Sequence, residues 1–283
     1  MMTSNQAVGE LSKSLQVNDY PTSYLRELTN YVEIKPGDNS ELTATQSDKL
    51  KHVLTSLAAQ VPIEYLVGEA LFCERRFKAT PDVLIPRFDT EKLVNISLEV
   101  ARTITEPLTI IDIGTGSGAI IITLAKELEV RKDIEYLAMD ISPQALAIAK
   151  ENAKKHAMHN VIDFRLADTF PRNDLNEPYL PTTKNILIVS NPPYISETNY
   201  AALPKSVKDY EPKLALLEQT DFLDKLGTYL GFLRRNGRIV QVILEYSDLT
   251  GTAIQINIPS ESDFQQTIRQ VRSKQQPVNM PGI

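Results

Sequence analysis

Four short, mostly apolar runs mark the middle of the chain, and each ends at a polar or glycine-rich turn. They cover residues 108–113, 134–139, 161–166 and 186–189. Runs of this length and composition are typical of strands in a buried parallel sheet. Apolar residues at steps of three and four over residues 120–128 and 143–154 predict helices between the first three runs. The alternation predicts a βαβαβ unit and an α/β fold with a Rossmann-like, doubly wound sheet.

The N-terminal part of the chain has a helical pattern instead. Apolar residues recur at helical steps within residues 23–28 and 48–54, and Pro21 and Pro62 punctuate the segment. Because this part shows no chemistry of its own, we interpret residues 1–70 as a small helical domain that recognises a partner protein.

From residue 72 to residue 85 the spacing of apolar residues approaches every second position, as at Phe77, Val83 and Ile85. This pattern predicts a β-hairpin that links two domains. We therefore expect a hairpin linker over residues 71–90 and a catalytic domain over residues 91–283.

A glycine-rich loop directly follows the first strand run. Gly114, Gly116 and Gly118 separate that run from the helix expected after them. Glycine lets the backbone approach a ligand closely, and the N–H groups at the helix start point into the same space. The second run ends at Asp140, about 20 positions after the last glycine, where a carboxylate suits the hydroxyls of an adenosine ribose.

The fourth strand run stops at Asn191, Pro192, Pro193 and Tyr194. Proline lacks an N–H group and fixes φ, so this corner is stiff. The Asn191 amide, the carbonyl groups of the corner and the Tyr194 ring can together grip a planar group that carries N–H, such as a primary amide or an exocyclic amine. An ordinary strand-ending turn has the same composition, since asparagine and proline are common in turns.

We expect the two motifs to share one pocket. In a doubly wound sheet the strand order reverses between the first and fourth strands, so their carboxyl ends flank a crevice. The glycine loop alone, with Ala119, also fits the dinucleotide fingerprint, and Asp140 would serve NAD equally well. The Asn191 corner favours an adenosyl ligand facing an N–H target, because a dehydrogenase has no obvious use for such a wall.

Composition narrows the functional classes. The chain has 283 residues, 42% of them hydrophobic, with a net charge of −6 and a pI near 5.3. This balance argues against a protein that grips duplex nucleic acid through many phosphates. No apolar run reaches the ~18 residues of a membrane span and no signal-peptide pattern begins the chain, so we expect no membrane contact and a cytoplasmic protein.

The cysteine and histidine residues give no sign of a metal site. Cys73 is the single cysteine, and we interpret it as a small, half-buried apolar residue. His52, His156 and His159 show no ligand spacing with one another or with carboxylates. We predict no metal.

Three polar residues precede the first helix of the expected catalytic domain. Asp89 or Thr90 can cap that helix, and the helix dipole favours Glu91 in its first turn. Capping is our preferred interpretation of these residues. It does not explain Arg87, which we expect to help close a ligand pocket.

At these residues the chain resembles the class I S-adenosylmethionine-dependent methyltransferases. More narrowly, it resembles the protein-glutamine N5-methyltransferases that modify peptide chain release factors (PrmC/HemK type). The resemblance rests on residues 84–91, 112–118 and 191–194, and it extends from about residue 20 to residue 216. It implies S-adenosylmethionine as the cofactor, peptide chain release factors as partners, and contact between the helical domain and the release factor.

The resemblance also implies roles for single residues. The methionine part of the cofactor would be held by Gly114, Thr115, Gly116, Ser117 and Gly118, the ribose by Asp140, and the adenine edge by Asp168 with Thr169. Asn191 would face both cofactor and substrate. Together with the Pro192 carbonyl it would accept the N–H bonds of the substrate amide, within a corner completed by Pro193, while Tyr194 packs on the amide plane.

The chain departs from the family pattern in three places. Phe88 stands where the family has proline, Thr169 stands where a large aromatic residue is frequent, and residues 217–283 lack the usual closing motifs.

Three alternatives remain open. A ribosomal-protein glutamine methyltransferase has a segment like residues 69–73, although Thr90 and Glu91 favour the release-factor type. A DNA adenine-N6 methyltransferase shares the Asn-Pro-Pro-Tyr motif, but the net acidity disfavours it. A non-catalytic adenosyl-binding module is the alternative from another class.

Overall fold

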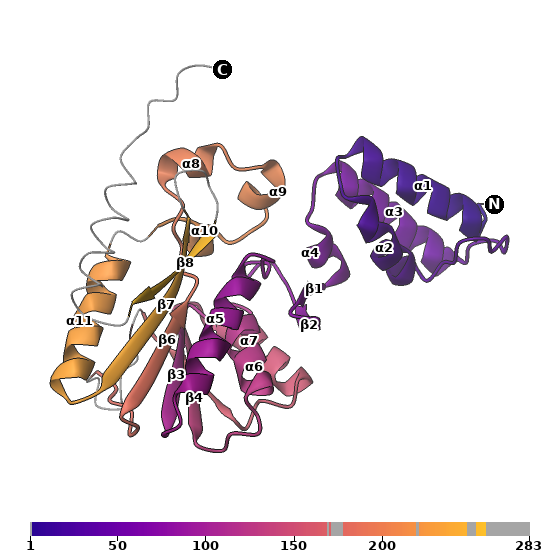
Figure 1. The fold of residues 1–283 in the computed structure, drawn as a ribbon. Coiled ribbons are helices and arrows are strands. Elements are labelled where there is room, and N and C mark those ends of the chain that lie inside the picture. Colours follow the sequence, from indigo (N-terminus) through magenta and orange to yellow (C-terminus); the bar gives the residue numbers. More distant parts are fainter. Residues whose placement is uncertain (1, 169, 171–177, 219–220, 248–252, 259–283) are drawn as a thin grey trace.

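A six-stranded sheet forms the centre of the fold (Figure 1). The computed structural model describes residues 2–168, 170, 178–218, 221–247 and 253–258. The strands are β3 (Leu108–Ile113), β4 (Ile134–Asp140), β5 (Ile162–Leu166), β6 (Asn185–Ser190), β7 (Ile239–Ser247) and β8 (Ala253–Ile258). Their order is β5-β4-β3-β6-β7-β8, with β8 antiparallel to β7 and the other neighbours parallel. The order reverses between β3 and β6, which confirms the predicted doubly wound α/β fold and all four predicted strands.

Helices cover both faces of this sheet. One face carries α5 (Thr90–Thr103), α6 (Ala119–Glu127) and α7 (Pro143–Lys155), and the other carries α11 (Phe222–Arg235) (Figure 1). Two hydrophobic clusters lie on the two sides, one around Leu93 and Ile121 and the other around Leu226 and Tyr229. Every residue of β3 is buried, including the polar Thr109 and Asp112, because helices cover both of its faces.

Three short helices follow β6 and lie at one end of the sheet (Figure 1). They are α8 (Glu197–Ala201), α9 (Lys205–Lys208) and α10 (Lys213–Leu216). The bridge between Ile195 and Leu217 brings the two ends of this segment together.

The N-terminal helices form a bundle beside the sheet domain (Figure 1). Its elements are α1 (Ser4–Val17), a 3-10 turn (Thr22–Tyr24), α2 (Leu25–Val32), α3 (Ala44–Ala58) and α4 (Ile63–Val67). Capping boxes begin α1 at Thr3 and α3 at Thr43. The bundle has its own buried cluster, and the helices expected around residues 23–28 and 48–54 are present as α2 and α3. The domain boundaries and the recognition role remain predictions.

A β-hairpin joins the bundle to the sheet domain, but it lies earlier in the chain than the 72–85 pattern predicted. Its strands are β1 (Glu69–Phe72) and β2 (Arg75–Lys78), and Cys73 and Glu74 form the tight turn with φ values of 46° and 60°. The predicted position was wrong because two of its apolar marks are loop residues. Val83 packs on Ala145 and Ile148 of α7, and Ile85 packs in a separate small cluster.

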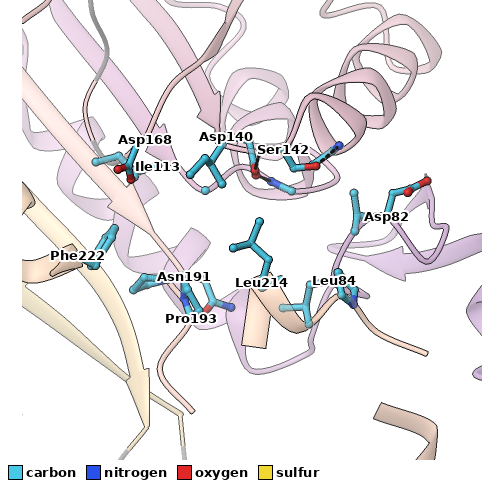
Figure 2. A pocket seen from close by; sticks show the side chains of 18 of the residues that line it. Asp82, Leu84, Ile113, Asp140, Ser142, Asp168, Asn191, Pro193, Leu214 and Phe222 are labelled. Carbon is cyan, nitrogen blue, oxygen red and sulfur yellow. Dashed lines mark hydrogen bonds between the residues drawn. The ribbon is translucent and has the colours of Figure 1, made fainter. Parts of the chain in front are cut away.

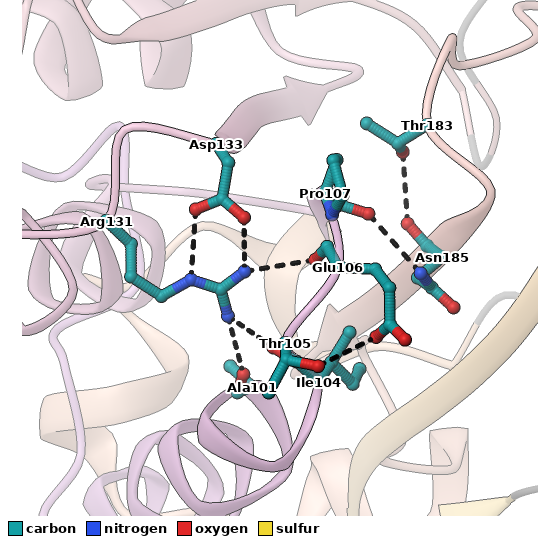
Figure 3. A network of polar contacts seen from close by, with 9 residues as sticks. All are labelled: Ala101, Ile104, Thr105, Glu106, Pro107, Arg131, Asp133, Thr183 and Asn185. Carbon is teal, nitrogen blue, oxygen red and sulfur yellow. Dashed lines mark hydrogen bonds and ion pairs between the residues drawn. The ribbon is translucent and has the colours of Figure 1, made fainter.

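Arg131 holds together the end of the sheet at which β3 and β4 begin (Figure 3). Its guanidinium group donates to the carbonyl oxygens of Ala101, Ile104 and Glu106 at 3.0, 2.5 and 3.0 Å, and it pairs with Asp133 at 2.7 Å. The last carbonyl groups of α5 therefore gain partners, and the carboxyl end of that helix is tied to the strand starts.

Within the described residues, no helix combines the length and the apolar character needed to cross a bilayer.

Candidate active site

A cavity opens at the carboxyl ends of β3, β4 and β6, where the strand order reverses (Figure 2). It encloses about 830 Å³ of atom-free space, counted out to its open mouth. Its walls include Gly114, Gly116, Asp140 and Asp168 together with Asn191, Pro192 and Pro193. The glycine loop and the proline corner therefore line the same cavity, while the roles of their residues stay predictions.

The glycine loop approaches this cavity through backbone that other residues rarely adopt. Gly116 has a φ of 54°, and a Cβ added to it would meet no atom within 4 Å, so its surroundings are open. Gly118 has a different task. A Cβ there would lie 2.8 Å from Ile122 Cδ1 and 3.2 Å from Ala149 Cβ, so glycine is needed for α6 to pack on α7.

Asp140 braces the same loop. Its Oδ2 accepts a hydrogen bond from the Gly116 N–H group at 2.8 Å, and its Oδ1 accepts one from the Ser142 N–H group at 2.9 Å. Burial raises the pKa of this carboxyl, and the backbone N–H groups oppose that shift. A carboxylate has lone pairs for further donors, so Asp140 can also accept hydrogen bonds from ribose hydroxyls in the cavity.

Three loop residues that were predicted to hold the cofactor do not line the cavity. They are Thr115, Ser117 and Gly118. Thr115 Oγ1 donates to buried Asp112 Oδ2 at 2.7 Å, and the Ser117 carbonyl accepts from Asn152 Nδ2 at 2.8 Å. These contacts fix the conformation of the loop through residues that do not line the cavity. Burial raises the pKa of Asp112 to about 7, and the hydrogen bond from Thr115 acts in the opposite direction.

Asp168 lies on the cavity wall after β5. Its Oδ2 pairs with Lys225 Nζ at 2.5 Å, and the same ammonium group reaches Asp221 at 2.8 Å. This pairing ties the end of β5 to α11. Thr169, its predicted neighbour at the adenine edge, lies outside the described residues.

The corner after β6 forms the opposite wall, as Figure 2 shows for Asn191 and Pro193 across from Asp140 and Ser142. Tyr194 is absent from the cavity lining. Its hydroxyl donates to Glu245 Oε1 at 3.4 Å, and its ring lies 5.6 Å from the ring of Tyr246. Burial is the largest cause that raises the pKa of Tyr194 to about 12. The tyrosine therefore supports the corner, and its predicted contact with the substrate remains untested.

The capping role predicted for Asp89 or Thr90 is wrong, whereas Glu91 lies in the first turn of α5 as predicted. Asp89 precedes α5 with helical dihedral angles and makes no side-chain cap hydrogen bond, although a cap of this kind needs extended backbone. Buried Thr90 instead accepts a hydrogen bond from Asn191 Nδ2 at 3.0 Å. Glu91 accepts one from the Cys73 N–H group at 2.8 Å, which fixes the strained hairpin turn.

Arg87 does not line the cavity, but it joins two segments that do. Its Nη2 pairs at 2.5 Å with Glu211, whose side chain is 1% exposed, and the other carboxylate oxygen accepts the Ile85 N–H group at 3.4 Å. The cavity-lining residues 82–84 and Pro212, Leu214 and Ala215 flank this pair. Arg87 thus helps to form the cavity by holding these segments together.

Several residues of the cavity wall were not predicted from the sequence as site residues. They are apolar residues from scattered segments, namely Val83, Leu84, Ile141, Ala145, Leu214 and Phe222. Apolar surface combined with the carboxylates of Asp140 and Asp168 suits a nucleoside, which has a flat base and a ribose with two hydroxyls. The residues present therefore fit an adenosyl ligand.

The fold and the site together define a Rossmann-like, S-adenosylmethionine-dependent methyltransferase. The family model that matches is described as a methyltransferase domain and covers residues 104–209. This class confirms the predicted cofactor, S-adenosylmethionine.

More narrowly, the chain belongs to the family of release factor glutamine methyltransferases, as the resemblance predicted. It is 34% identical over 222 residues to the release factor glutamine methyltransferase of Bacteroides thetaiotaomicron, covering 75% of each chain. It is 37% identical to that of Cereibacter sphaeroides, covering 73% of this chain and 69% of the relative. For the relative from Nitratidesulfovibrio vulgaris the identity is 43%, over 55% of this chain and 49% of that protein.

The match therefore spans about half to three quarters of the length of these relatives. Among solved structures, the catalytic domain of hMettl16 in complex with MAT2A 3'UTR hairpin 1 is similar at a TM-score of 0.48 and 13% identity. The similarity covers 81% of this chain and 73% of that one. At this identity and TM-score, the similarity does not refine the assignment.

Proposed function

We propose that this protein transfers a methyl group from S-adenosylmethionine to the side-chain amide nitrogen (N5) of a glutamine in a peptide chain release factor. The observation that carries this proposal is the shared cavity, lined by Gly116 and Asp140 on one side and by Asn191 and Pro192 on the other. Family membership supports the release factor as the substrate protein. An exposed glutamine-bearing loop is the part of the release factor that this cavity would admit.

The cofactor would lie along the glycine-loop side of the cavity. Asp140 would accept hydrogen bonds from the ribose hydroxyls, and Asp168 would accept them from the adenine amine. Ile113 and Val83 supply apolar surface for the remaining parts. When bound, S-adenosylmethionine supplies an electrophilic methyl group on a sulfonium centre.

The acceptor would lie against the proline corner. An amide nitrogen is a poor nucleophile because its lone pair is delocalised into the carbonyl group. Asn191 Oδ1 and the Pro192 carbonyl oxygen would accept its two N–H groups and hold the nitrogen in line with the methyl group, which lowers the barrier by positioning. The same oxygens stabilise the positive charge that grows on nitrogen as the methyl group arrives.

The proton leaves after the new bond has formed. Of the described residues that line the cavity, none is a histidine, a cysteine or a lysine that could take it. The methylated amide nitrogen is cationic and strongly acidic, so it can release its proton to water. The stiffness of Pro192 and Pro193 keeps the accepting carbonyl in place throughout.

Labelled cofactor tests this function against its alternatives. The protein is incubated with methyl-labelled S-adenosylmethionine and, in separate reactions, with a release factor, a ribosomal protein or DNA. We expect label in the release factor alone, and no label in a release factor whose acceptor glutamine is replaced by alanine. Label in ribosomal protein or DNA would establish the corresponding alternative, and label in none would favour a non-catalytic adenosyl-binding module.

A further inference from the structure

We propose that Thr90 is a positioning residue that orients the side-chain amide of Asn191 for the acceptor. Thr90 holds the amide nitrogen of Asn191, so that the amide oxygen faces the substrate. This inference rests on the proposed function, because it concerns the group that would accept the substrate N–H bond.

The contact joins two parts of the chain that are far apart in sequence. Asn191 Nδ2 donates to Thr90 Oγ1 at 3.0 Å across 101 positions. Thr90 is 4% exposed, and Asn191 lines the cavity. The hydroxyl therefore reaches Asn191 from within the protein and leaves the other side of the amide to the ligand.

Both partners are held by separate elements. Thr90 is the first residue of α5, and its N–H group donates to the Arg87 carbonyl at 3.1 Å. Arg87 in turn pairs with buried Glu211. Asn191 directly follows β6, whose residues pair with both β3 and β7. The hydrogen bond thus connects two fixed points, and it can set the angle of the amide plane.

The direction of this amide decides whether the acceptor can bind. The oxygen and nitrogen ends of a carboxamide are similar in shape, but oxygen accepts hydrogen bonds and nitrogen donates them. The terminal torsion of asparagine is broad and nearly two-fold, so the side chain alone does not select one end. With Nδ2 bound to Thr90, Oδ1 is left for the substrate. In the reverse orientation, the NH₂ groups of Asn191 and of the substrate would face each other.

The test compares Thr90→Val, which keeps the shape but removes the hydroxyl, with Thr90→Ser, which keeps the hydroxyl. We expect Thr90→Val to lower kcat for release factor methylation roughly tenfold, the effect of losing one hydrogen bond to a polar group. The Kd for S-adenosylmethionine should stay the same, and Thr90→Ser should recover most of the lost turnover. Equal turnover in wild type and Thr90→Val would overturn the inference.

A double-mutant cycle separates positioning from general damage. If Thr90 acts through Asn191, Thr90→Val should cause no further loss in an Asn191→Ala background under single-turnover conditions. An additional tenfold loss there would contradict the inference. Ser97→Ala on the same helix is the matched control, since the Ser97 hydroxyl donates only within α5, to the Leu93 carbonyl at 2.7 Å. It should leave kcat unchanged.

A measurement without turnover distinguishes failure of this inference from failure of the proposed function. In the wild-type protein, nuclear Overhauser contacts should join the Asn191 side-chain amide protons to the Thr90 methyl group. Absence of these contacts overturns the inference even if the release factor is methylated. Their presence in a protein that methylates no release factor supports the orientation of Asn191 and removes the proposed function alone.

Discussion

Single side chains at the cavity support the fold and at the same time line the cavity. Asn191 donates inward to Thr90 and faces the cavity with the rest of its amide. Asp140 accepts from the glycine loop and lines the same space. Each is therefore held in place before any ligand arrives, which is the condition for electrostatic stabilisation of a developing charge.

Asn191→Ala tests the acceptor role directly. The variant removes one preorganised acceptor of the substrate N–H bond, so we expect turnover to fall at least ~100-fold. Binding of S-adenosylmethionine, measured by calorimetry, should survive, because the glycine loop and Asp140 are unchanged. Turnover close to that of the wild type would remove Asn191 from this role.

The raised pKa of Asp112 leads to a prediction for how the stability of the fold depends on pH. Its folded pKa of about 7 lies above the ordinary value of 3.8, so the folded state binds its proton more tightly than the unfolded state does. The wild type should therefore lose stability relative to Asp112→Asn as pH rises from about 4 to about 7, by at most roughly 1.4 kcal/mol per pH unit. Urea unfolding of both proteins across this range measures the difference. A difference that stays flat would show that Asp112 does not titrate there.

Among single residues, those that directly follow a strand could be predicted as site residues from the sequence. Residues whose partner lies far away along the chain could not. Asp140 and Asn191 could be placed because each ends an apolar run at the carboxyl edge of the sheet. Thr90 could not be linked to Asn191, since its partner lies 101 positions away and helix capping explained the same residue type. Tyr194 looked like part of the wall, but its ring packs in the cluster beneath it.

Among the secondary-structure elements, the glycine loop depends on α7 and the hairpin. Buried Asn152 of α7 accepts from the Lys78 N–H group at 2.7 Å and donates to the carbonyl oxygens of Lys78 and Ser117 at 3.1 and 2.8 Å. One side chain thus joins β2, α7 and the loop that reaches the cavity.

Replacing this residue should destabilise the protein and weaken cofactor binding together. Asn152→Leu leaves buried backbone groups of Lys78 and Ser117 without partners, so we expect a loss of about 3 kcal/mol in unfolding free energy. The Kd for S-adenosylmethionine should rise as the loop loosens. Glu151→Gln is the control, because Glu151 also reaches Lys78 but from the surface, and exposed ion pairs contribute little. Equal stability of the two variants would contradict this account of the loop.

Strands that are buried on both faces could be predicted from the sequence. The hairpin, which lies next to buried loop residues, could not be placed correctly. Strands β3 and β6 are buried on both faces, so their apolar runs identify them. The hairpin was placed too late because Val83 and Ile85 are buried loop residues that imitate a strand pattern. Its turn has no glycine although Cys73 and Glu74 have positive φ, so the usual sequence signal for a tight turn was missing.

At the scale of the whole molecule, a hydrogen bond and a groove link the helical bundle to the sheet domain. The Tyr210 hydroxyl donates to the Ala59 carbonyl at the end of α3 at 2.9 Å. A groove between the two parts is lined by Tyr24 and Glu64 on one side and by Lys205 and Glu211 on the other. The bundle is thus connected to the segment that carries part of the cavity wall.

Tyr210→Phe should loosen this connection without touching the cavity. If the bundle contributes to release factor binding, KM for the release factor should rise two- to tenfold, the effect of one hydrogen bond, while kcat and cofactor affinity stay unchanged. Tyr200→Phe is the matched control, because the Tyr200 hydroxyl bonds within its own segment, to the Lys208 carbonyl at 3.2 Å. Unchanged KM in Tyr210→Phe would argue against the bundle as a recognition domain.

The general plan of the molecule followed from the sequence because the topology of parallel sheets is restricted. Given strands separated by helices, the reversal of order between β3 and β6 brings Gly116 and Asn191 to one crevice. The outer wall did not follow, because Leu214 and Phe222 reach the cavity from segments whose position depends on contacts such as that between Arg87 and Glu211. The sequence from residue 217 onward departs from the family pattern. Two strands of this region, β7 and β8, belong to the described residues and extend the sheet beyond β6.

Locating the methyl group on the product tests the central claim most directly. A release factor is incubated with S-adenosylmethionine and the protein, and tandem mass spectrometry of its peptides determines which atom carries the new methyl group. If the cavity holds the cofactor beside an amide bound at the Asn191 corner, we expect one methyl group on the side-chain nitrogen of one glutamine, formed at least ~100-fold more slowly by Asn191→Ala. A methyl group on any other residue type, or an unchanged rate with Asn191→Ala, would contradict it.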